Sequence, residues 1–284
     1  MLSIYKDIKS YAKINIGLKI LDLLPDGYHS VSTIMQEIDF HDLITIKPIE
    51  KLEIKITCEG PIEVPQDTSN LCVQATQLIF NRYKCTHGIH IILKKNIPVG
   101  AGLGGGSSNA ACILYTLNKL FNLKINEFDL HQLAFKLGCD VPFFINGGTQ
   151  LSEGKGEKLS PLSINLDQYY ILLVLPKFSI STKWAYSFFK NDLCKRFDSN
   201  KFRSFQQSVD WTLFENDFEK VINLTYPEIE QIKEILINKG SLFASLSGSG
   251  SAMFGIFDDF LKVDLAHQAL KTYNCHIVRP INKR

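Results

Sequence analysis

Hydrophobic and polar positions alternate near the start of the chain, which is typical of a β-strand. In YAKINIGLKIL, from Tyr11, the two faces of the predicted strand carry Ala12, Ile14, Ile16 and Leu18 on one side and Tyr11, Lys13, Asn15 and Gly17 on the other. Turn-forming residues in DLLPDGYHS interrupt this pattern, and strand-like stretches resume beyond it. The chain up to about Gly60 is therefore predicted to be largely β-structure.

Helical spacing of apolar residues replaces the alternation further along the chain. It predicts one helix over residues 70–83, a second that carries the apolar stripe from Ala110 to Phe121, and a third over DLHQLAFKLG, which ends at Gly138. IHIILKK, from Ile89, is predicted to be a strand that leads into a glycine cluster, IPVGAGLGGGSSNAA, at residues 97–111. The predicted order is strand, loop, helix, helix, turn.

A polar, glycine-bearing stretch, GGTQLSEGKGEKLSPLS, separates this part of the chain from a second set of elements. YYILLVLP predicts a strong strand, TYPEIEQIKEILINKG a helix, and KTYNCHIVRPINKR a final strand. The elements mix without regular alternation and without an internal repeat. We therefore predict an α+β fold in two domains, residues 1–155 and 156–284.

Composition narrows the classes of function. The chain is 45% hydrophobic and 21% charged, and its net charge of +2 without basic blocks argues against nucleic acid as a partner. No apolar run approaches the ~20 residues of a membrane-spanning helix, and no targeting segment is visible, so we expect a cytoplasmic protein with no membrane partner. Seven cysteines without a CxxC pair predict reduced core residues, and the histidines show no zinc-ligand spacing.

The glycine cluster has three interpretations: a flexible linker, a dinucleotide-binding turn, or a phosphate-binding loop. A strand and an amphipathic helix flank it, which argues against a linker. Gly100, Gly102 and Gly105 match GxGxxG, but the following stretch leads into another helix, whereas a dinucleotide fold requires a second strand. Gly106 stands where a Walker loop has its lysine. Phosphate binding needs only close backbone approach, free N–H groups and a helix N-terminus, all of which residues 102–108 supply.

Four ordered motifs resemble those of the GHMP kinases, a family named for galactokinase, homoserine, mevalonate and phosphomevalonate kinases. PVGAGLGGGSSNAA resembles the ATP-binding motif, and AKINIGL, LGCDVPFF and SLSGSGSAMFGIF resemble the others. The resemblance covers most of the chain. It implies a two-lobed fold, with an N-terminal lobe like a ribosomal protein domain, a C-terminal ferredoxin-like α/β lobe, and the active site in the cleft between them. It also implies ATP and Mg²⁺ as cofactors.

The same resemblance places ATP at the glycine cluster. Lys95, just before the cluster, either reaches the nucleotide or is a solvated charge. The Ser107 and Ser108 hydroxyls either cap the following helix or bond phosphate and metal. The nucleotide-binding residues predicted in this way are Lys95, Pro98, Val99, Gly100, Ala101, Gly102, Leu103, Gly104, Gly105, Gly106, Ser107 and Ser108.

Lys13 in AKIN and Asp140 in GCDVPFF match the family's catalytic lysine and aspartate. A carboxylate near the acceptor hydroxyl can take its proton, and an ammonium can keep that carboxylate ionised and offset charge on the transferred phosphoryl group. Without the motifs, Lys13 would be interpreted as a solvated strand lysine and Asp140 as a turn residue after a helix.

DGYHSVSTIMQEIDFHD, residues 26–42, resembles the pattern of family members that phosphorylate the 2-hydroxyl of a cytidine diphosphate-linked methylerythritol, in the non-mevalonate route to isoprenoid precursors. Tyr28 and His29 match the GYH of this pattern, and Tyr186 matches a second aromatic position. Two aromatic rings can sandwich a pyrimidine while His29 reads its polar edge. Core packing is the alternative for each ring.

Two further residues are assigned to the substrate. Asn15 shares a strand face with Lys13 and is predicted either to bond a diphosphate oxygen or to orient the lysine. Gly248 lies in a second glycine-serine run, SLSGSGSAMF, which by resemblance closes on the substrate. A structural turn is the alternative for this run.

Two other functions stay open. One is a GHMP kinase that acts on homoserine or a mevalonate-like alcohol, against which DGYH argues, because a small alcohol needs no aromatic clamp for a base. The other is a non-catalytic nucleotide- or RNA-binding protein, against which stand the weak net charge and the joint presence of Lys13 and Asp140. The oligomeric state is not predicted.

Overall fold

The computed structural model describes residues 2–189 and 209–282. The chain forms two compact units that interleave along the sequence. The first unit contains Met1–Ala12, Phe40–Val99 and Gly104–Asn146, and the second contains Lys13–Asp39, Gly100–Leu103 and Gly147–Arg284. Two early segments of the chain, Lys13–Asp39 and Gly100–Leu103, therefore belong to the same unit as the later elements.

Two long antiparallel strands, β1 (Tyr5–Leu23) and β2 (His29–Ile49), each contribute residues to both units. The alternation in the sequence predicted β1, but it also suggested one polar face. In the structure both faces are buried over residues 12–18, and Lys13 and Asn15 are only 3% and 2% exposed. The strands are joined by a tight turn in which the Leu24 amide donates to the Tyr28 carbonyl at 2.7 Å.

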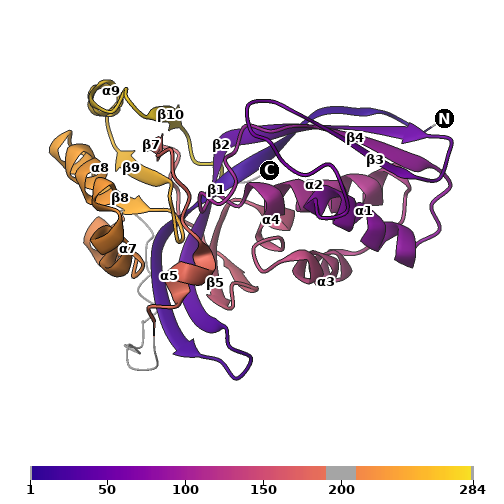
Figure 1. The fold of residues 1–284 in the computed structure, drawn as a ribbon, viewed down its shortest axis with the longest axis horizontal. Helices are drawn as coiled ribbons and strands as arrows, with labels where there is room; N and C mark the ends of the chain where they lie inside the picture. The colour runs from indigo at the N-terminus through magenta and orange to yellow at the C-terminus, as the bar shows by residue number, and fades with distance from the viewer. Residues whose placement is uncertain (1, 190–208, 283–284) are drawn as a thin grey trace. The chain divides into compact units, whose positions relative to one another are not determined.

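In the first unit, residues 43–49 of β2 pair antiparallel with β4 (Gly88–Lys94), and β4 pairs parallel with β3 (Ile54–Glu59). Four helices pack with one another, and the first of them also packs with β3: α1 (Leu71–Arg82), α2 (Gly105–Leu120), α3 (Glu127–Leu137) and α4 (Phe143–Asn146). Figure 1 shows α1, α2 and α3 on one side of β3 and β4.

Local capping explains where these helices begin. The Asn70 side chain accepts a hydrogen bond from the Cys72 amide at the start of α1, and Asn126 accepts one from the Asp129 amide at the start of α3. Gly138 ends α3 as predicted, although its φ of 160° is extended backbone and not the left-handed conformation of a common glycine cap.

In the second unit, β2 pairs with β5 (Thr149–Gly154), which pairs with β6 (Lys158–Pro161). A separate antiparallel sheet has the order β10-β7-β9-β8, formed by β7 (Tyr170–Leu175), β8 (Phe243–Leu246), β9 (Met253–Phe257) and β10 (Asn274–Val278). The accompanying helices are α5 (Thr182–Tyr186), the 3₁₀ turn η1 (Trp211–Leu213), α7 (Glu219–Thr225), α8 (Pro227–Asn238) and α9 (Phe260–Ala269). This strand order is that of the predicted ferredoxin-like lobe.

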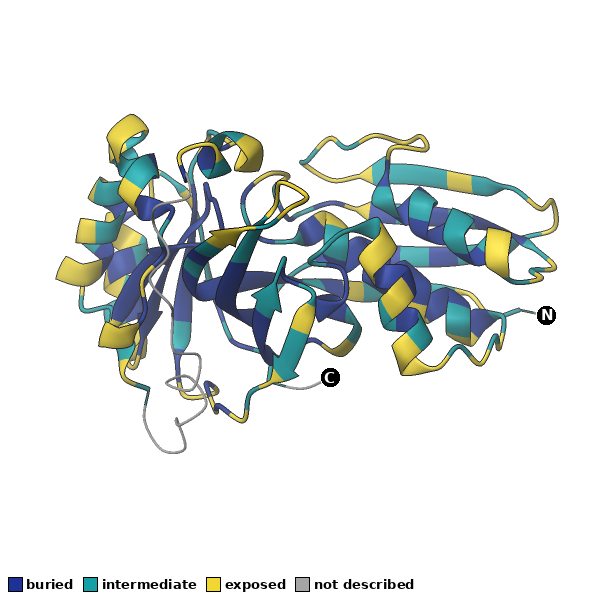
Figure 2. Cartoon of the chain, turned by 90° about the horizontal axis from the view of Figure 1, so that it is seen from below, coloured by how far each residue is buried: buried dark blue, intermediate teal, exposed yellow. Residues whose placement is uncertain are grey.

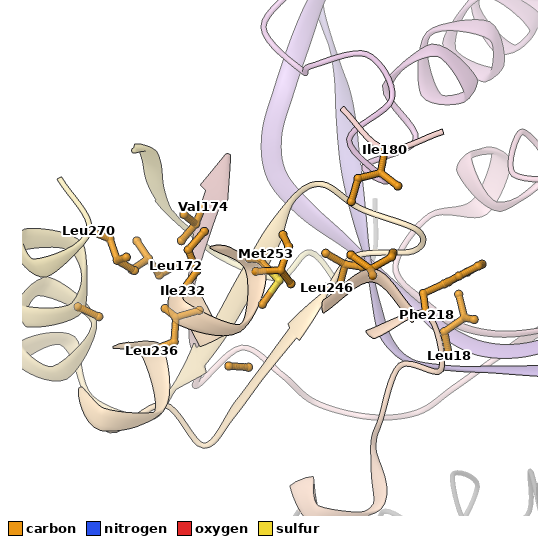
Figure 3. Packing of buried hydrophobic residues seen from close by; sticks show 14 of the residues in the cluster. Leu18, Leu172, Val174, Ile180, Phe218, Ile232, Leu236, Leu246, Met253 and Leu270 are labelled. Carbon is orange, nitrogen blue, oxygen red and sulfur yellow. The ribbon is translucent and has the colours of Figure 1, made fainter. Parts of the chain in front are cut away.

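The core of the second unit lies between this sheet and its helices. Leu172 and Val174 of β7 lie in one hydrophobic cluster with Ile232 and Leu236 of α8. The same cluster extends to Leu18 of β1, which lies beside Phe218 (Figure 3). Figure 2 shows the buried strands in dark blue beside helices whose outer positions are exposed. Strand β1 therefore takes part in the core that also supports the second glycine-serine run.

In the described part of the chain, no helix combines the length and the apolar character that crossing a membrane requires. Six cysteines are described, and none of them forms a disulfide. Cys72 and Cys112 are buried, whereas Cys58, Cys85, Cys139 and Cys275 are half-buried, so the expectation that the cysteines are core residues is wrong for these four. Cys194 lies outside the described residues.

The packing of this core predicts how truncation of the Ile232 side chain changes stability. Ile232 is fully buried in the cluster, so Ile232→Ala leaves a cavity and should lower the free energy of unfolding by about 2–5 kcal/mol in urea denaturation. Leu224→Ala is the matched control, because Leu224 is 85% exposed and its loss should change stability by less than about 0.5 kcal/mol. Equal losses for the two variants would contradict this packing.

Candidate active site

Lys13 lies on β1 with its ammonium held by two acceptors of the second unit. Its Nζ donates to Asn15 Oδ1 at 2.6 Å and to the Gly102 carbonyl at 2.8 Å. Asn15 in turn donates from Nδ2 to the Thr33 hydroxyl at 3.0 Å, and that hydroxyl donates to the Gly17 carbonyl at 2.7 Å. A buried charge needs such partners, because removal from water otherwise disfavours its charged form. Lys13 is therefore a fixed, buried cation and not the solvated strand lysine of the alternative interpretation.

The Gly102 carbonyl also accepts a hydrogen bond from the Ser247 hydroxyl, at 2.9 Å. The two glycine-rich segments approach so closely here that a Cβ on Gly102 would lie 1.9 Å from the Ser247 carbonyl oxygen. Gly102 has a φ of +76°, which also disfavours any other residue. Gly248 lies near the same point, since a Cβ on it would be 3.2 Å from Asn15 Oδ1. Four predicted site residues, Lys13, Asn15, Gly102 and Gly248, are thus brought together.

The remainder of the first glycine cluster forms a loop that turns directly into α2. Ala101 and Leu103 are buried and Val99 is exposed, as part of the loop formed by Pro98, Gly100 and their neighbours. Gly104, the N-cap of α2, is left-handed with a φ of 67° and provides no side-chain cap. The first helical hydrogen bond runs from the Ser108 amide to the Gly104 carbonyl, so the amides of the first turn lack helical acceptors.

This helix start has the chemistry of an anion site. The first turn of α2 contains no acidic residue, and the helix dipole adds about half a positive charge to its amides. The Ser107 hydroxyl makes no side-chain hydrogen bond within the described residues, whereas the Ser108 hydroxyl is buried and bonds the Ser10 hydroxyl at 2.7 Å. Of the two serines, Ser107 is therefore the one that remains accessible to a ligand.

Lys95 lies inside the first unit and not on its surface. It is 2% exposed and donates to Asp42, which is fully buried. Burial lowers the pKa of the Lys95 ammonium below its ordinary value, and the neighbouring Asp42 carboxylate opposes that change. A Cβ on Gly105 would lie 2.8 Å from Lys95 Nζ, so the pair sits directly against the start of α2.

Asp42 is the centre of a buried polar network around Lys95. Its Oδ1 accepts from the Asn96 and Ile97 amides at 2.7 and 2.9 Å, and its Oδ2 accepts from Asn109 Nδ2 at 2.9 Å. The same Asn109 group donates to the Ser10 hydroxyl at 2.9 Å. The network ties the end of β4, the residues before the loop and the first turns of α2 together. The predicted contact of Lys95 with nucleotide stays a prediction, and the structure shows a buried ion pair.

Asp140 lies in the turn between α3 and α4 and is half-buried. The turn is closed by the Val141 amide, which donates to the Gly138 carbonyl at 3.2 Å. Asp140 belongs to the first unit and Lys13 to the second. Their predicted pairing therefore stays a prediction.

The predicted aromatic residues lie in the second unit, in an arrangement that the sequence did not predict. The ring that stacks on Tyr186 is His29, with centroids 5.4 Å apart and planes inclined by 17°. Tyr28 is 59% exposed and has the Lys155 ammonium 5.1 Å from its ring centroid. Lys155 also pairs with Asp26, and this hydrogen bond, followed by one from the Tyr28 amide, holds the pKa of the Asp26 carboxyl below its ordinary value.

His29 is further fixed by a hydrogen bond between its Nε2 and the Phe189 carbonyl, at 2.9 Å. Because a carbonyl can only accept, Nε2 carries the proton, and in a neutral ring Nδ1 is then an acceptor. His29 can therefore offer an acceptor to the amino group of a base, which fits the predicted reading of a polar edge.

Three residues at these positions escaped the sequence reasoning: Asp42, Ser247 and Lys155. Asp42 is the last residue of DGYHSVSTIMQEIDFHD, and Ser247 lies in the second glycine-serine run, so both belong to motifs. Nothing in the spacing of these motifs indicated that Asp42 binds Lys95, 53 residues away, or that Ser247 binds Gly102, 145 residues away. Lys155 meets Asp26 from 129 residues along the chain. No three His, Cys, Asp or Glu side chains gather as a metal site within the described part of the chain.

Two family models match the chain. The model described as GHMP kinases N terminal domain matches residues 70–148, and the one described as GHMP kinases C terminal matches residues 196–275. The matched segments lie on either side of the boundary predicted after residue 155, which itself stays a prediction.

Known proteins resemble the chain over nearly its whole length. The 4-diphosphocytidyl-2-C-methyl-D-erythritol kinase of Prosthecochloris aestuarii is 40% identical over 269 residues, 93% of each chain. A crystal structure of 4-(cytidine 5'-diphospho)-2C-methyl-D-erythritol kinase superposes with a TM-score of 0.78 and 26% identity, over 96% of this chain and 99% of that one. A homoserine kinase from Cytophaga hutchinsonii gives a TM-score of 0.71 at 19% identity, over 99% and 98% of the two chains, a likeness of fold alone.

The buried ion pair between Lys95 and Asp42 predicts that Lys95 contributes to the stability of the fold. Lys95→Met leaves the Asp42 carboxylate buried without its cation and should lower the free energy of unfolding by about 3–5 kcal/mol in urea denaturation. Lys94→Met, at the exposed last residue of β4, is the control and should change the free energy of unfolding by less than about 0.5 kcal/mol. A Lys95→Met protein of unchanged stability but weakened ATP binding would instead assign Lys95 to the nucleotide.

Proposed function

The chain belongs to the GHMP kinase family, and we propose that it is an ATP-dependent kinase that phosphorylates the 2-hydroxyl of 4-diphosphocytidyl-2-C-methyl-D-erythritol. The observation that carries this proposal is the 40% identity, over 93% of both chains, with a kinase of that name. The proposed enzyme acts in the cytoplasm, in the non-mevalonate route to isoprenoid precursors.

In this proposal residues 1–155 form the ATP-binding domain and residues 156–284 the C-terminal domain. The phosphates of ATP lie against the loop from Pro98 to Ser108. Support comes from the uncapped start of α2, whose amides and dipole suit an anion, and from the left-handed Gly104, which allows the backbone to approach a ligand closely.

Lys13 and Asp140 are the proposed catalytic residues. The Asp140 carboxylate accepts the proton of the substrate 2-hydroxyl, the hydroxyl oxygen bonds the γ-phosphorus, and the bond from that phosphorus to the bridging oxygen of ADP breaks. The Lys13 ammonium offsets charge on the phosphoryl group. Its two hydrogen bonds, to Asn15 and Gly102, support this role because they hold the cation in one place before substrate arrives.

Magnesium is proposed to accompany ATP. Mg²⁺ prefers oxygen ligands, and in kinases it is held largely by the phosphates and water. The described residues fit this mode, because they include no acidic cluster for a separate metal site and because the Ser107 hydroxyl is unpaired at the start of α2. Ser107 is thus the proposed protein ligand. When bound, the ion neutralises charge that develops on the phosphate oxygens.

The cytosine ring is proposed to stack on Tyr28, with the amino group of the base donating to His29 Nδ1. The high exposure of Tyr28 supports stacking on it, because its ring is not used in a core. The sequence predicted that Tyr186 and Tyr28 sandwich the base. In this proposal Tyr186 instead stacks on His29 and fixes the orientation of that ring. Gly248 and Asn15 complete the proposed substrate contacts near Lys13.

The reaction can be tested directly. Purified protein is incubated with ATP, Mg²⁺ and, separately, the diphosphocytidyl alcohol, homoserine or mevalonate, and the acceptor is followed by phosphorus NMR. We expect a new phosphomonoester signal with the diphosphocytidyl alcohol only. Phosphorylation of homoserine or mevalonate, with that alcohol untouched, would overturn the proposal.

Replacement of the proposed base should separate catalysis from binding. General-base assistance is worth roughly 10² to 10⁴ in rate, so Asp140→Asn should lower kcat by about that factor and leave ATP affinity nearly unchanged. Steady-state kinetics and calorimetric titration with ATP check the two parts. An Asp140→Asn enzyme with full turnover would show that the base is another group.

Stacking on Tyr28 predicts a selective loss of substrate affinity. An aromatic platform is worth roughly 1–3 kcal/mol per base, so Tyr28→Ala should raise KM for the diphosphocytidyl alcohol about 5- to 150-fold, with KM for ATP unchanged. Phe260→Ala, which removes another exposed aromatic ring of the same unit, is the control. Equal KM values in the two variants would exclude Tyr28 as the platform.

A further inference from the structure

Asn216 is a buried amide that belongs to none of the motifs described above. It follows η1 in the stretch LFENDF and is 2% exposed. Its Nδ2 donates to the carbonyls of Leu246 and Gly248, both at 2.8 Å, and its Oδ1 accepts from the Phe218 amide at 3.0 Å. One amide thus has both hydrogens and its oxygen bonded to backbone, and both hydrogens go to the second glycine loop, residues 246–250.

The segment that carries Asn216 is fixed to β1. The Leu18 amide donates to the Glu215 carbonyl at 2.8 Å, and the Asp217 amide donates to the Leu18 carbonyl at 2.9 Å. A third bond runs from the Ile20 amide to Asp217 Oδ2 at 3.0 Å. Strand β1 also carries Lys13, so the second glycine loop is anchored, through Asn216, to the strand of the proposed catalytic cation.

The loop that Asn216 holds contacts both acceptors of Lys13. Ser247, between the two carbonyls that Asn216 bonds, donates its hydroxyl to the Gly102 carbonyl, the same oxygen to which Lys13 donates. Gly248 packs against Asn15, whose Oδ1 is the other acceptor of Lys13. A displacement of this loop would therefore move the two groups that fix the ammonium.

The side-chain amide of Asn216 is well suited to hold two neighbouring backbone carbonyls of the loop. Leu246 and Gly248 present buried carbonyls two residues apart, and an unsatisfied buried carbonyl costs about 1–3 kcal/mol. Two hydrogens on a single nitrogen satisfy both oxygens at once and so set the distance between them. A carboxylate of the same shape would instead place an acceptor against two acceptors.

We propose that Asn216 is a positioning residue for phosphoryl transfer. It holds the second glycine loop in the conformation in which Ser247 bonds the Gly102 carbonyl and Gly248 packs against Asn15, so that these two acceptors fix the Lys13 ammonium. The inference rests on the proposed function, because Lys13 acts on the phosphoryl group only there. Asn216 itself touches neither ATP nor the alcohol in this proposal, so its effect passes through Lys13.

A double-mutant cycle tests this dependence. Misplacement of a catalytic group by about 1 Å can cost roughly 10²-fold in rate, so Asn216→Ser should lower kcat by about that factor with little change in either KM. In a Lys13→Met background, where the cation is already absent, the same change should lower the residual rate less than about threefold. A purely structural role predicts equal losses in both backgrounds, and that result would overturn the inference.

Asn223→Ser is the matched control. Asn223 lies in the same unit and donates to Glu230 without touching either glycine loop, so its loss should leave kcat unchanged. Circular dichroism and urea denaturation establish that each variant is folded at the assay temperature. If the Asn216→Ser variant is not folded, Ser247→Ala replaces it in the double-mutant cycle, because this change removes the hydrogen bond from Ser247 to the Gly102 carbonyl that also binds Lys13. The same two outcomes then support or overturn the inference.

The two proposals fail in distinguishable ways. The wild-type protein is assayed first, and absence of phosphorylation of the diphosphocytidyl alcohol counts against the proposed function. If wild type phosphorylates another alcohol, the cycle is run with that alcohol. Unchanged kcat in folded Asn216→Ser, or equal losses with and without Lys13, counts against the positioning role alone.

Discussion

The carbonyl oxygen of Gly102 is the point on which the second unit's site depends. It accepts hydrogen bonds from the Lys13 ammonium and the Ser247 hydroxyl, and so joins β1 and both glycine-rich segments at a single atom. The approach is possible only because Gly102 lacks a side chain, as a Cβ would meet the Ser247 carbonyl at 1.9 Å. A buried ammonium is stable where such oriented dipoles replace its water. Glycine at this position therefore serves the close packing of the two backbone segments.

A second buried cation organises the first unit in the same manner. Lys95 and Asp42 are both removed from water, and the carboxylate is further stabilised by two backbone amides and by Asn109. Burial of such an ion pair costs desolvation free energy, so the pair contributes little net stability. Removal of one partner nevertheless destabilises the fold strongly, because the other charge is left buried without compensation. Its position against Gly105 means that the start of α2, the proposed phosphate site, rests on an ion pair whose geometry is fully specified.

The two cations illustrate how one residue type acquires different tasks from its surroundings. The Lys13 ammonium donates to an amide oxygen and to a backbone carbonyl, and these hydrogen bonds orient it for the phosphoryl group in the proposed mechanism. Lys95 is held by a carboxylate, so its charge is locally compensated. The structure shows which groups hold each ammonium, and the predicted contact of Lys95 with the nucleotide stays a prediction.

Local signals along the sequence were sufficient for much of the fold. Period-two and helical spacing predicted β1, β4, β7, α1, α2, α3 and α8, because these patterns follow from backbone geometry within each element. The ordered motifs identified the family and the two-lobed fold. Tertiary structure alone decided the burial of both faces of β1, the interleaving of the two units, and the stacking of His29 on Tyr186. It also decided the carboxylate partner of Lys95, 53 residues away, and the two carbonyls that Asn216 bonds, 30 and 32 residues away. Contacts at such separations leave no period in the sequence, since a side chain's burial and its partner are set by elements that meet only when the chain has folded.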